Sequence, residues 1–238
     1  MVRLVNRQGA EKLLPETMHL KQIPLDLNVP TQTLHGLSGA IKTGKTTMRP
    51  RQLTIEGRIY HPGDKERIRQ DLDDLLQFLS HTPIEVYRQE PHDRFLLAHP
   101  QGAMQDWIDL GAELALRIPM IALDPYWYGP EVEVTVSGTQ TITVEGNAPT
   151  MPLITTTSSV SSLTVSNLLT GKGFAVSGAT GVIEVDNDER NPSVVVGGVS
   201  RLDLISEPWL LNGFELLPGQ NQITTNTPIT VTYRPRWY

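Results

Sequence analysis

The chain has no cysteine. A disulfide framework, a thiol nucleophile and a thiolate metal site are therefore excluded. The sequence also has no apolar run near the ~20 residues that a membrane-spanning helix needs. Its first ten residues alternate apolar and charged side chains and contain no signal-peptide core. We therefore expect a soluble protein, made in the cytoplasm and without membrane insertion.

Positive charge and aromatic side chains are also scarce. The 20 Lys and Arg residues are outnumbered by 26 Asp and Glu residues, which gives a net charge of -6. A protein that grips nucleic acid through its phosphates has a basic surface instead. Only 6% of the residues are aromatic, so three consecutive aromatic residues at 126–128 stand out.

These aromatic residues divide the chain. Pro125 and Pro130 keep the backbone extended and remove two amide donors. The side chains of Tyr126, Trp127 and Tyr128 between them are too apolar for a solvated linker. We expect a short, stiff joint between two domains, residues 1–129 and residues 130–238. A chain of 238 residues is long enough for two domains of ordinary size.

The first domain is predicted to consist of strands packed over a single α-helix. Residues 52–60 alternate apolar and polar side chains as a half-buried strand does. Asp64 can cap the first turn of a helix that continues to residue 79. The apolar side chains of that helix recur at helical spacing, namely Ile68, Leu72, Leu75, Leu76 and Leu79. Further strands are expected at residues 84–88, 94–98, 103–110 and 113–121.

The second domain is predicted to be a β-sandwich, because short strands alternate with turn signals throughout it. The strands at residues 131–136 and 140–145 are separated by Ser137 and Gly138, so they are predicted to form a hairpin. Residues 186–191 begin like a calcium loop. They lack the glycine and glutamate of such a loop, so we interpret them as a hairpin tip.

Residues 39–46, GAIKTGKT, match the phosphate-loop pattern letter for letter. In that pattern the backbone amides hold phosphates, Lys45 reaches the terminal phosphates and Thr46 holds magnesium. A helix should follow at once, but Pro50 stands four residues after Thr46, where it costs about 3 kcal/mol in a helix. We interpret residues 42–51 as a flexible basic loop, and nucleotide binding is an alternative.

No catalytic, cofactor-binding or metal-binding set is visible, so we expect no enzyme and no cofactor. The histidines have no metal-ligand spacing, and there is no G-x-S-x-G motif. Carbohydrate binding by the second half is another alternative, which would need exposed aromatic side chains. Phe174, Trp209 and Phe214 are the candidates away from the ends, and Trp209 is the best candidate glycan contact. Burial in the sandwich core is the competing interpretation of all three.

Five stretches, in an order and spacing that cover most of the chain, form a pattern. They are Gly-Arg-Ile-Tyr at residues 57–60, the helix at 64–79, the aromatic joint at 124–128, Gly-Asn-Ala-Pro at 146–149 with Pro152, and Leu-Pro-Gly-Gln-Asn at 217–221. Together they resemble the distal tail proteins (Dit) of bacteriophages with long, non-contractile tails. The joint and the last turn are the most specific parts. The basic loop is outside the pattern.

The resemblance implies a structural role at the tail tip of the virion. It implies that the first domain is a β-sandwich with one α-helix, which assembles into a homo-hexameric ring. A galectin-like β-sandwich would follow and point outward. The expected partners are the major tail (tube) protein, the tape-measure protein, the tail-tip hub protein and receptor-binding proteins. DNA would pass through the ring without specific binding.

The basic loop has no role in this pattern, although it is long and charged. We therefore expect it to take part in contacts between subunits. The residues concerned are Lys42, Lys45, Arg49 and Arg51.

Overall fold

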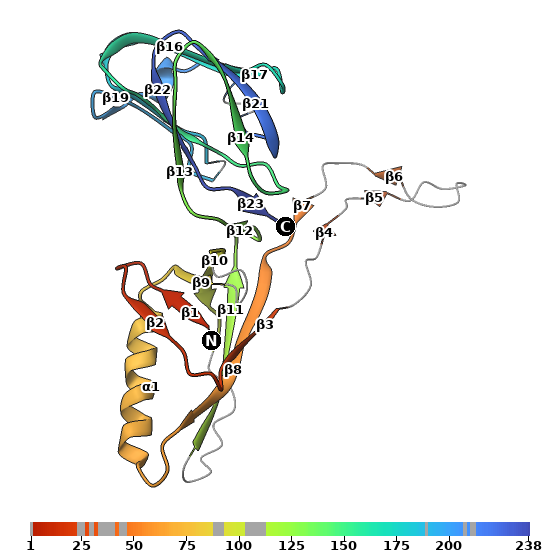
Figure 1. Ribbon diagram of the computed structural model, residues 1–238, viewed down its shortest axis with the longest axis vertical. Coiled ribbons are helices and arrows are strands. Elements are labelled where there is room, and N and C mark those ends of the chain that lie inside the picture. Colours follow the sequence, from red (N-terminus) through yellow and green to blue (C-terminus); the bar gives the residue numbers. More distant parts are fainter. Residues whose placement is uncertain are drawn as a thin grey trace. The chain divides into compact units, whose positions relative to one another are not determined.

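The computed structural model describes residues 2–22, 27–28, 31–32, 41–42, 47–87, 93–102, 113–188, 190–206, 209 and 213–238. The chain forms two compact units, Met1–Trp127 and Tyr128–Tyr238. Strands predominate in both units (Figure 1), so the expected mainly-β fold is confirmed. Within the described residues, no helix is long and apolar enough to cross a membrane.

An antiparallel sheet in the order β2-β1-β9-β10-β11-β8-β3 is the framework of the N-terminal unit. Its strands are β1 (Arg3–Val5), β2 (Glu11–Leu13), β3 (His19–Gln22), β8 (Arg51–Tyr60), β9 (Ile84–Tyr87), β10 (Phe95–Pro100) and β11 (Glu113–Ala122). The pairs β4 (Leu27–Asn28) with β7 (Thr47–Met48) and β5 (Thr31–Gln32) with β6 (Ile41–Lys42) form two short ladders. The strand predicted at 103–110 lies outside the described residues.

The longest pairing, between β8 and β11, confirms the strands predicted at residues 52–60 and 113–121. It runs from Glu113 opposite Tyr60 to Ala122 opposite Arg51. Alternate side chains of both strands are buried, namely Leu53, Ile55, Ile59, Leu114, Leu116 and Ile118. The remaining side chains face the other side of the sheet, because the side-chain period of a strand is two.

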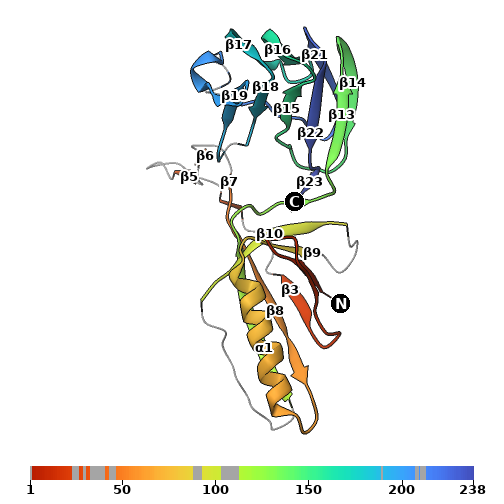
Figure 2. The same cartoon turned by 90° about the vertical axis from the view of Figure 1, so that its left-hand side faces the viewer.

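The predicted helix is confirmed as α1 (Lys65–Ser80). The Asp64 carboxylate accepts a hydrogen bond from the Arg67 amide at 3.0 Å, which satisfies an amide of the first turn. Ile68, Leu72, Leu75 and Leu79 are buried, and the helix contacts β8 (Figure 2). Leu76 was expected in the same stripe, but it lies at the margin of the stripe and is 41% exposed.

The C-terminal unit is a sandwich of two antiparallel sheets, in the orders β13-β22-β15-β18-β19-β20 and β14-β21-β16-β17. The first contains β13 (Val132–Val136), β15 (Leu153–Thr156), β18 (Ile183–Asp186), β19 (Ser193–Val196), β20 (Val199–Ser200) and β22 (Ile229–Tyr233). The second contains β14 (Thr139–Val144), β16 (Val160–Asn167), β17 (Lys172–Gly181) and β21 (Gly219–Thr225). The remaining elements are β12 (Trp127–Tyr128), η1 (Leu202–Leu204) and β23 (Arg236–Trp237).

Apolar side chains from both sheets of this unit form one core, which includes Ile154, Val165, Phe214 and Val231. This arrangement is that of a β-sandwich, in which the inner faces of two sheets interdigitate.

The predicted hairpin of residues 131–136 and 140–145 is wrong. β13 pairs with β22 and β14 pairs with β21, so the two strands belong to different sheets. Gly138 has a φ of 67° and does form a tight turn, as expected. A turn signal fixes where the chain reverses but not which sheet the next strand joins. That choice depends on β21 and β22, which lie far along the chain.

Candidate assembly surfaces

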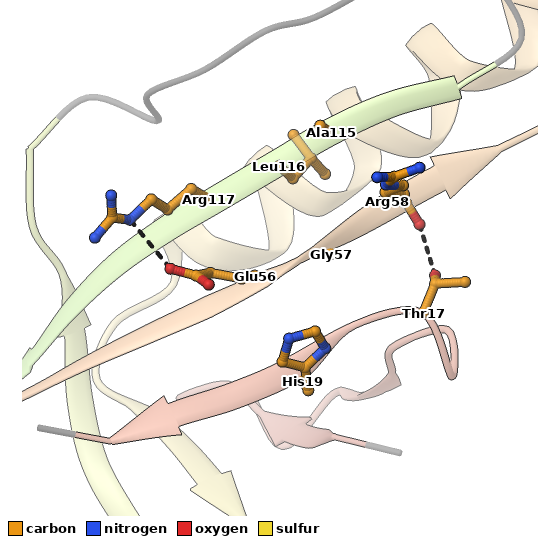
Figure 3. Close-up of a pocket in the computed structure, with 8 residues that line it drawn as sticks. All are labelled: Thr17, His19, Glu56, Gly57, Arg58, Ala115, Leu116 and Arg117. Atoms are coloured by element: carbon orange, nitrogen blue, oxygen red, sulfur yellow. Dashed lines mark hydrogen bonds and ion pairs between the residues drawn. The ribbon is translucent and has the colours of Figure 1, made fainter.

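The outward side of β3, β8 and β11 contains a shallow depression (Figure 3). Its lining residues are Thr17, His19, Glu56, Gly57, Arg58, Ala115, Leu116 and Arg117. Strand register brings them together, because Glu56 lies opposite His19 on one neighbouring strand and opposite Arg117 on the other. The depression is therefore built on three paired strands and not on loops.

Gly57 allows residues 17 and 18, which precede β3, to lie very close to β8 beside this depression. A Cβ atom at this position would overlap Met18 and lie 2.6 Å from the carbonyl oxygen of Thr17. The Thr17 hydroxyl donates a hydrogen bond to the carbonyl oxygen of Arg58 at 2.7 Å, which holds this close approach in place. Sequence reasoning missed this role. A glycine inside a strand pattern is the signal that could have found it, since it often marks a close backbone approach.

The charges around the depression are balanced by two ion pairs. Arg58 Nη1 lies 3.0 Å from Glu113 Oε1, and Arg117 Nε lies 3.4 Å from Glu56 Oε1. Both arginine side chains are more than half exposed, so each pair contributes only about 0–1 kcal/mol to stability. The described residues contain no group of His, Cys, Asp and Glu that could hold a metal ion. Such a face is suited to contact with a protein of complementary charge.

The basic loop is only partly described. Lys42 belongs to β6, where it lies opposite Thr31, and Lys45 lies outside the described residues. Arg49 is exposed, so it remains a candidate for a subunit contact. Arg51 is not part of a loop: it is the first residue of β8, is 7% exposed, and has its guanidinium 5.8 Å from the centre of the Trp127 ring. The alternation of β8 turns Arg51 to the same side as Leu53.

The phosphate-loop match falls on the same segment. Most of residues 39–46 lie outside the described residues. Ile41 and Lys42 are in β6, which pairs with β5. A phosphate loop needs turn geometry at these positions, so this pairing counts against nucleotide binding.

The aromatic joint is packed on both sides of the unit boundary. Within the N-terminal unit, the Asp124 carboxylate accepts the Tyr126 amide at 3.3 Å and Trp127 is 2% exposed. Within the C-terminal unit, the guanidinium of Arg236 lies 5.2 Å from the centre of the Tyr128 ring. Gly129 donates its amide to the carbonyl of Pro235 at 2.9 Å. The stiffness of the joint remains a prediction.

A buried asparagine builds the turn at residues 217–221. Asn221 Oδ1 accepts hydrogen bonds from the Leu217 amide at 2.9 Å and from Asn167 Nδ2 at 2.9 Å. Its Nδ2 donates to the carbonyl of Leu217 at 2.7 Å. Gly219 has a φ of 92°, which disfavours any other residue. The sequence pattern Leu-Pro-Gly-Gln-Asn is therefore explained by a turn that one side chain holds closed.

The three candidate sugar contacts are all in the sandwich core. Trp209 is 3% exposed, and its indole N–H donates to Asn187 Oδ1. Phe174 and Phe214 pack edge to face, with ring centres 5.6 Å apart at 89°. None of them offers an exposed ring to a sugar, which disfavours Trp209 as a glycan contact. Burial was the competing interpretation of these residues, and it holds.

A family model matches most of the second unit. Residues 145–237 match the family model described as the C-terminal domain of the siphovirus-type tail component. No curated protein matches the chain. The C-terminal unit is thus similar to a domain of siphovirus-type tail components.

The fold of the whole chain is similar to that of a distal tail protein. The crystal structure of Dit (gp 19.1) of phage SPP1, described as a paradigm of the hub adsorption apparatus in phages that infect Gram-positive hosts, matches with a TM-score of 0.75. The two proteins are 16% identical, and the match covers 100% of each chain. The resemblance to the distal tail family is thereby confirmed.

Two baseplate structures give a more distant match. The phage p2 baseplate in its activated conformation, with Ca, matches with a TM-score of 0.57 at 8% identity, over 99% of this chain and 98% of the other. The same baseplate with Sr matches with a TM-score of 0.54 at 8% identity, over 97% of each chain. At this identity the likeness concerns the fold.

Proposed function

We propose that this protein is a structural hub of a phage tail tip. In this proposal it forms a homo-hexameric ring that joins the tail tube and the tape-measure protein to the tail-tip hub protein and to receptor-binding proteins. The observation that carries the proposal is the match over the full length of both chains to a Dit protein described as part of a hub adsorption apparatus. The chain acts in the virion and catalyses no reaction.

The N-terminal unit has surfaces that fit this role. A closed ring needs two different patches on each subunit, because each copy contacts the next with one patch and the previous copy with another. The depression on β3, β8 and β11 offers both charge signs on a rigid sheet, and we assign it to one of the two patches. Lys42, Lys45 and Arg49 of the basic loop are candidates for the other.

The charge of the chain fits passage of DNA without binding. A pore that grips the phosphates would slow the transit of the genome, and such binding needs clustered lysine and arginine. The chain instead has a net charge of -6. The C-terminal sandwich, which we propose to be galectin-like, points away from the ring and contacts the receptor-binding proteins.

The experiment that tests the ring is a mass measurement combined with negative-stain microscopy. The purified full chain should have about six times the 26.4 kDa mass of one subunit and should appear as six-fold rings. A monomer at every concentration, with no ring even after mixing with the tail tube and tail-tip hub proteins, contradicts the proposal. A calorimetric titration with magnesium and ATP should give no heat, and heat that depends on Lys45 would support the nucleotide alternative.

A further inference from the structure

The two sheets of the C-terminal unit end in four edge strands, and three of them are protected. β13 carries Glu133, and the preceding Glu131 is paired with Arg234 at 3.4 Å. β20 has two residues. β17 is covered by the segment after η1, because Ser206 donates its amide to the carbonyl of Ala175 at 2.9 Å. Charge, shortness and coverage are the usual means by which proteins prevent strand addition at an edge.

The fourth edge, β14, is neither short nor covered by a paired segment within the described residues, and the nearest charge along the chain after it, Glu145, comes after its last residue. Its sequence TQTITV contains no charge and no proline. Its ladder with β21 is regular over all six residues and has no bulge. Within the described residues, β21 is the strand to which β14 is hydrogen-bonded. Among the described residues, no strand pairs with the opposite edge of β14, and the strand itself is uncharged.

The hydrogen-bond pattern shows which backbone groups point outward at this edge. The Thr225 amide donates to the carbonyl of Gly138, which lies opposite it, so this is a hydrogen-bonded pair. Hydrogen-bonded and non-hydrogen-bonded pairs alternate in an antiparallel ladder. Thr139, Thr141 and Thr143 therefore direct their N–H and C=O groups away from β21. The carbonyl of Thr143 accepts the Tyr233 hydroxyl at 3.3 Å, which fits this direction and closes one end of the edge.

The side chains beside this edge are uncharged as well. Thr139, Thr141 and Thr143 are exposed on the outer face, next to Gln220 and Gln222 of β21. A strand added here would meet a row of threonines, which pair best with other β-branched or hydroxyl side chains. A charged side chain would find no counter-charge in this row.

We infer that β14 is a docking edge for an extended, uncharged segment of a different protein chain, which adds to the sheet as a further strand. This inference rests on the proposed ring. Neighbouring copies in a six-fold ring are related by one sixth of a turn, so their β14 strands cannot pair about a two-fold axis. A head-to-tail contact would need another open edge on this unit, and the other three are protected. Each ring therefore presents six such edges to partner chains.

The test uses a fluorescent synthetic peptide with the sequence of residues 219–225, the uncharged strand that β14 already accepts on its other side. The peptide is titrated into the full-length chain up to millimolar concentration, and amide hydrogen exchange is measured with and without it. At about ten times the dissociation constant, exchange at Thr139 and Thr141 should slow about tenfold. Exchange at Gln140 and Ile142, which already bond to β21, should not change.

Thr141→Pro is the matched variant, because it removes an outward N–H and leaves the ladder with β21 intact. It should weaken peptide binding at least about tenfold without changing the melting temperature by more than a few degrees. Thr141→Val keeps the amide and should bind as the natural chain does. A peptide with proline at its central position should not bind.

Three results would overturn the inference. The first is that the natural chain does not bind the peptide. The second is that Thr141→Pro binds the peptide as well as the natural chain does. The third is that the peptide protects only amides that lie outside β14. Association of the chain with itself that Thr141→Pro abolishes would assign the edge to a second copy instead. A chain that forms no ring even with the tail tube and tail-tip hub proteins, but still binds the peptide, would refute the ring and not the edge. The two failures are therefore distinguishable.

Discussion

The two units present opposite kinds of surface on similar sheets. The outward face of β3, β8 and β11 carries arginine and glutamate side chains in pairs across strands. The outward face of β14 and β21 carries threonine and glutamine and no charge. Paired charges of both signs form a pattern that a partner can match in only one orientation. Such a face suits contact with an identical copy in one fixed register. An uncharged edge offers its backbone, which suits a partner that arrives as an extended strand.

The strongest expected effect is on the N-terminal unit. Gly57→Ala places a Cβ atom 2.6 Å from the carbonyl oxygen of Thr17, which is backbone and cannot rotate away. We expect a loss of about 2–4 kcal/mol in the unfolding free energy of this unit, measured by denaturant titration. Arg58→Ala, which removes the neighbouring exposed side chain, should cost less than about 1 kcal/mol. Equal losses of unfolding free energy in Gly57→Ala and Arg58→Ala would show that the approach of residues 17 and 18 to Gly57 is not tight.

A comparable effect is expected in the C-terminal unit. Asn221→Ala leaves the backbone of Leu217 and the amide of Asn167 without their partner. Because these groups are buried or half-buried, the expected loss is about 2–3 kcal/mol, read from thermal unfolding of this unit. The control Gln222→Ala changes the next residue on the exposed face and should be within about 0.5 kcal/mol of the natural chain. If Gln222→Ala loses as much stability as Asn221→Ala, the proposed role of the Asn221 side chain in the turn is contradicted.

A smaller effect is expected from Trp209→Phe. The change keeps an aromatic ring in the core but removes the hydrogen bond to Asn187. The expected loss is about 1–2 kcal/mol in unfolding free energy, and a glycan array should show no binding by either form. If the natural chain binds a sugar and Trp209→Phe does not, the result would support carbohydrate binding by the C-terminal unit.

Arg117→Glu sharpens the comparison between the two surfaces. It replaces the ion pair with Glu56 by two like charges in a well-solvated place. The stability of the single subunit should fall by less than about 1 kcal/mol, while ring assembly should be lost in size-exclusion chromatography. Thr164→Glu, on the exposed face of the C-terminal sheet, is the control and should still assemble. If Arg117→Glu still forms intact rings, the depression is not part of the contact between subunits.

The smallest effect concerns alkaline pH. Burial is the main cause that raises the pKa of the Tyr233 hydroxyl, and Glu145 raises it further. The folded state therefore favours the protonated phenol, and stability that is present below the unfolded pKa of about 10 is lost as the pH rises through the folded pKa. Tyr233→Phe should flatten this part of a plot of melting temperature against pH. If the slope of melting temperature against pH is the same in Tyr233→Phe, groups other than Tyr233 cause the loss of stability at alkaline pH.

Local features were predictable from the sequence, and long-range pairing was not. Asp64 and the apolar stripe from Ile68 to Leu79 are signals within one helix, and α1 forms where they predict it. Residues 132–136 and 139–144 also formed strands as expected, but their partners lie about 90 residues later along the chain. Period and turn signals carry no information about that choice.

For the candidate surfaces, too, local features were predictable from the sequence and long-range contacts were not. The uncharged sequence of β14 is visible in the printed sequence, but its position at an edge depends on the pairing of the whole sheet. Gly57 is visible as a glycine in a strand, but the close approach of Met18 is a contact between segments that are distant in the sequence. Arg51 was placed in a loop because basic residues precede it. Its burial beside Trp127 depends on a residue 76 positions later.

Cryo-electron microscopy of the tail tip of intact virions tests the central claim most directly. We expect six copies of this two-unit fold around the tail axis, with the N-terminal units in contact and an open lumen for DNA. A tail tip that lacks the chain, or that holds it without six-fold contact between N-terminal units, would contradict the account.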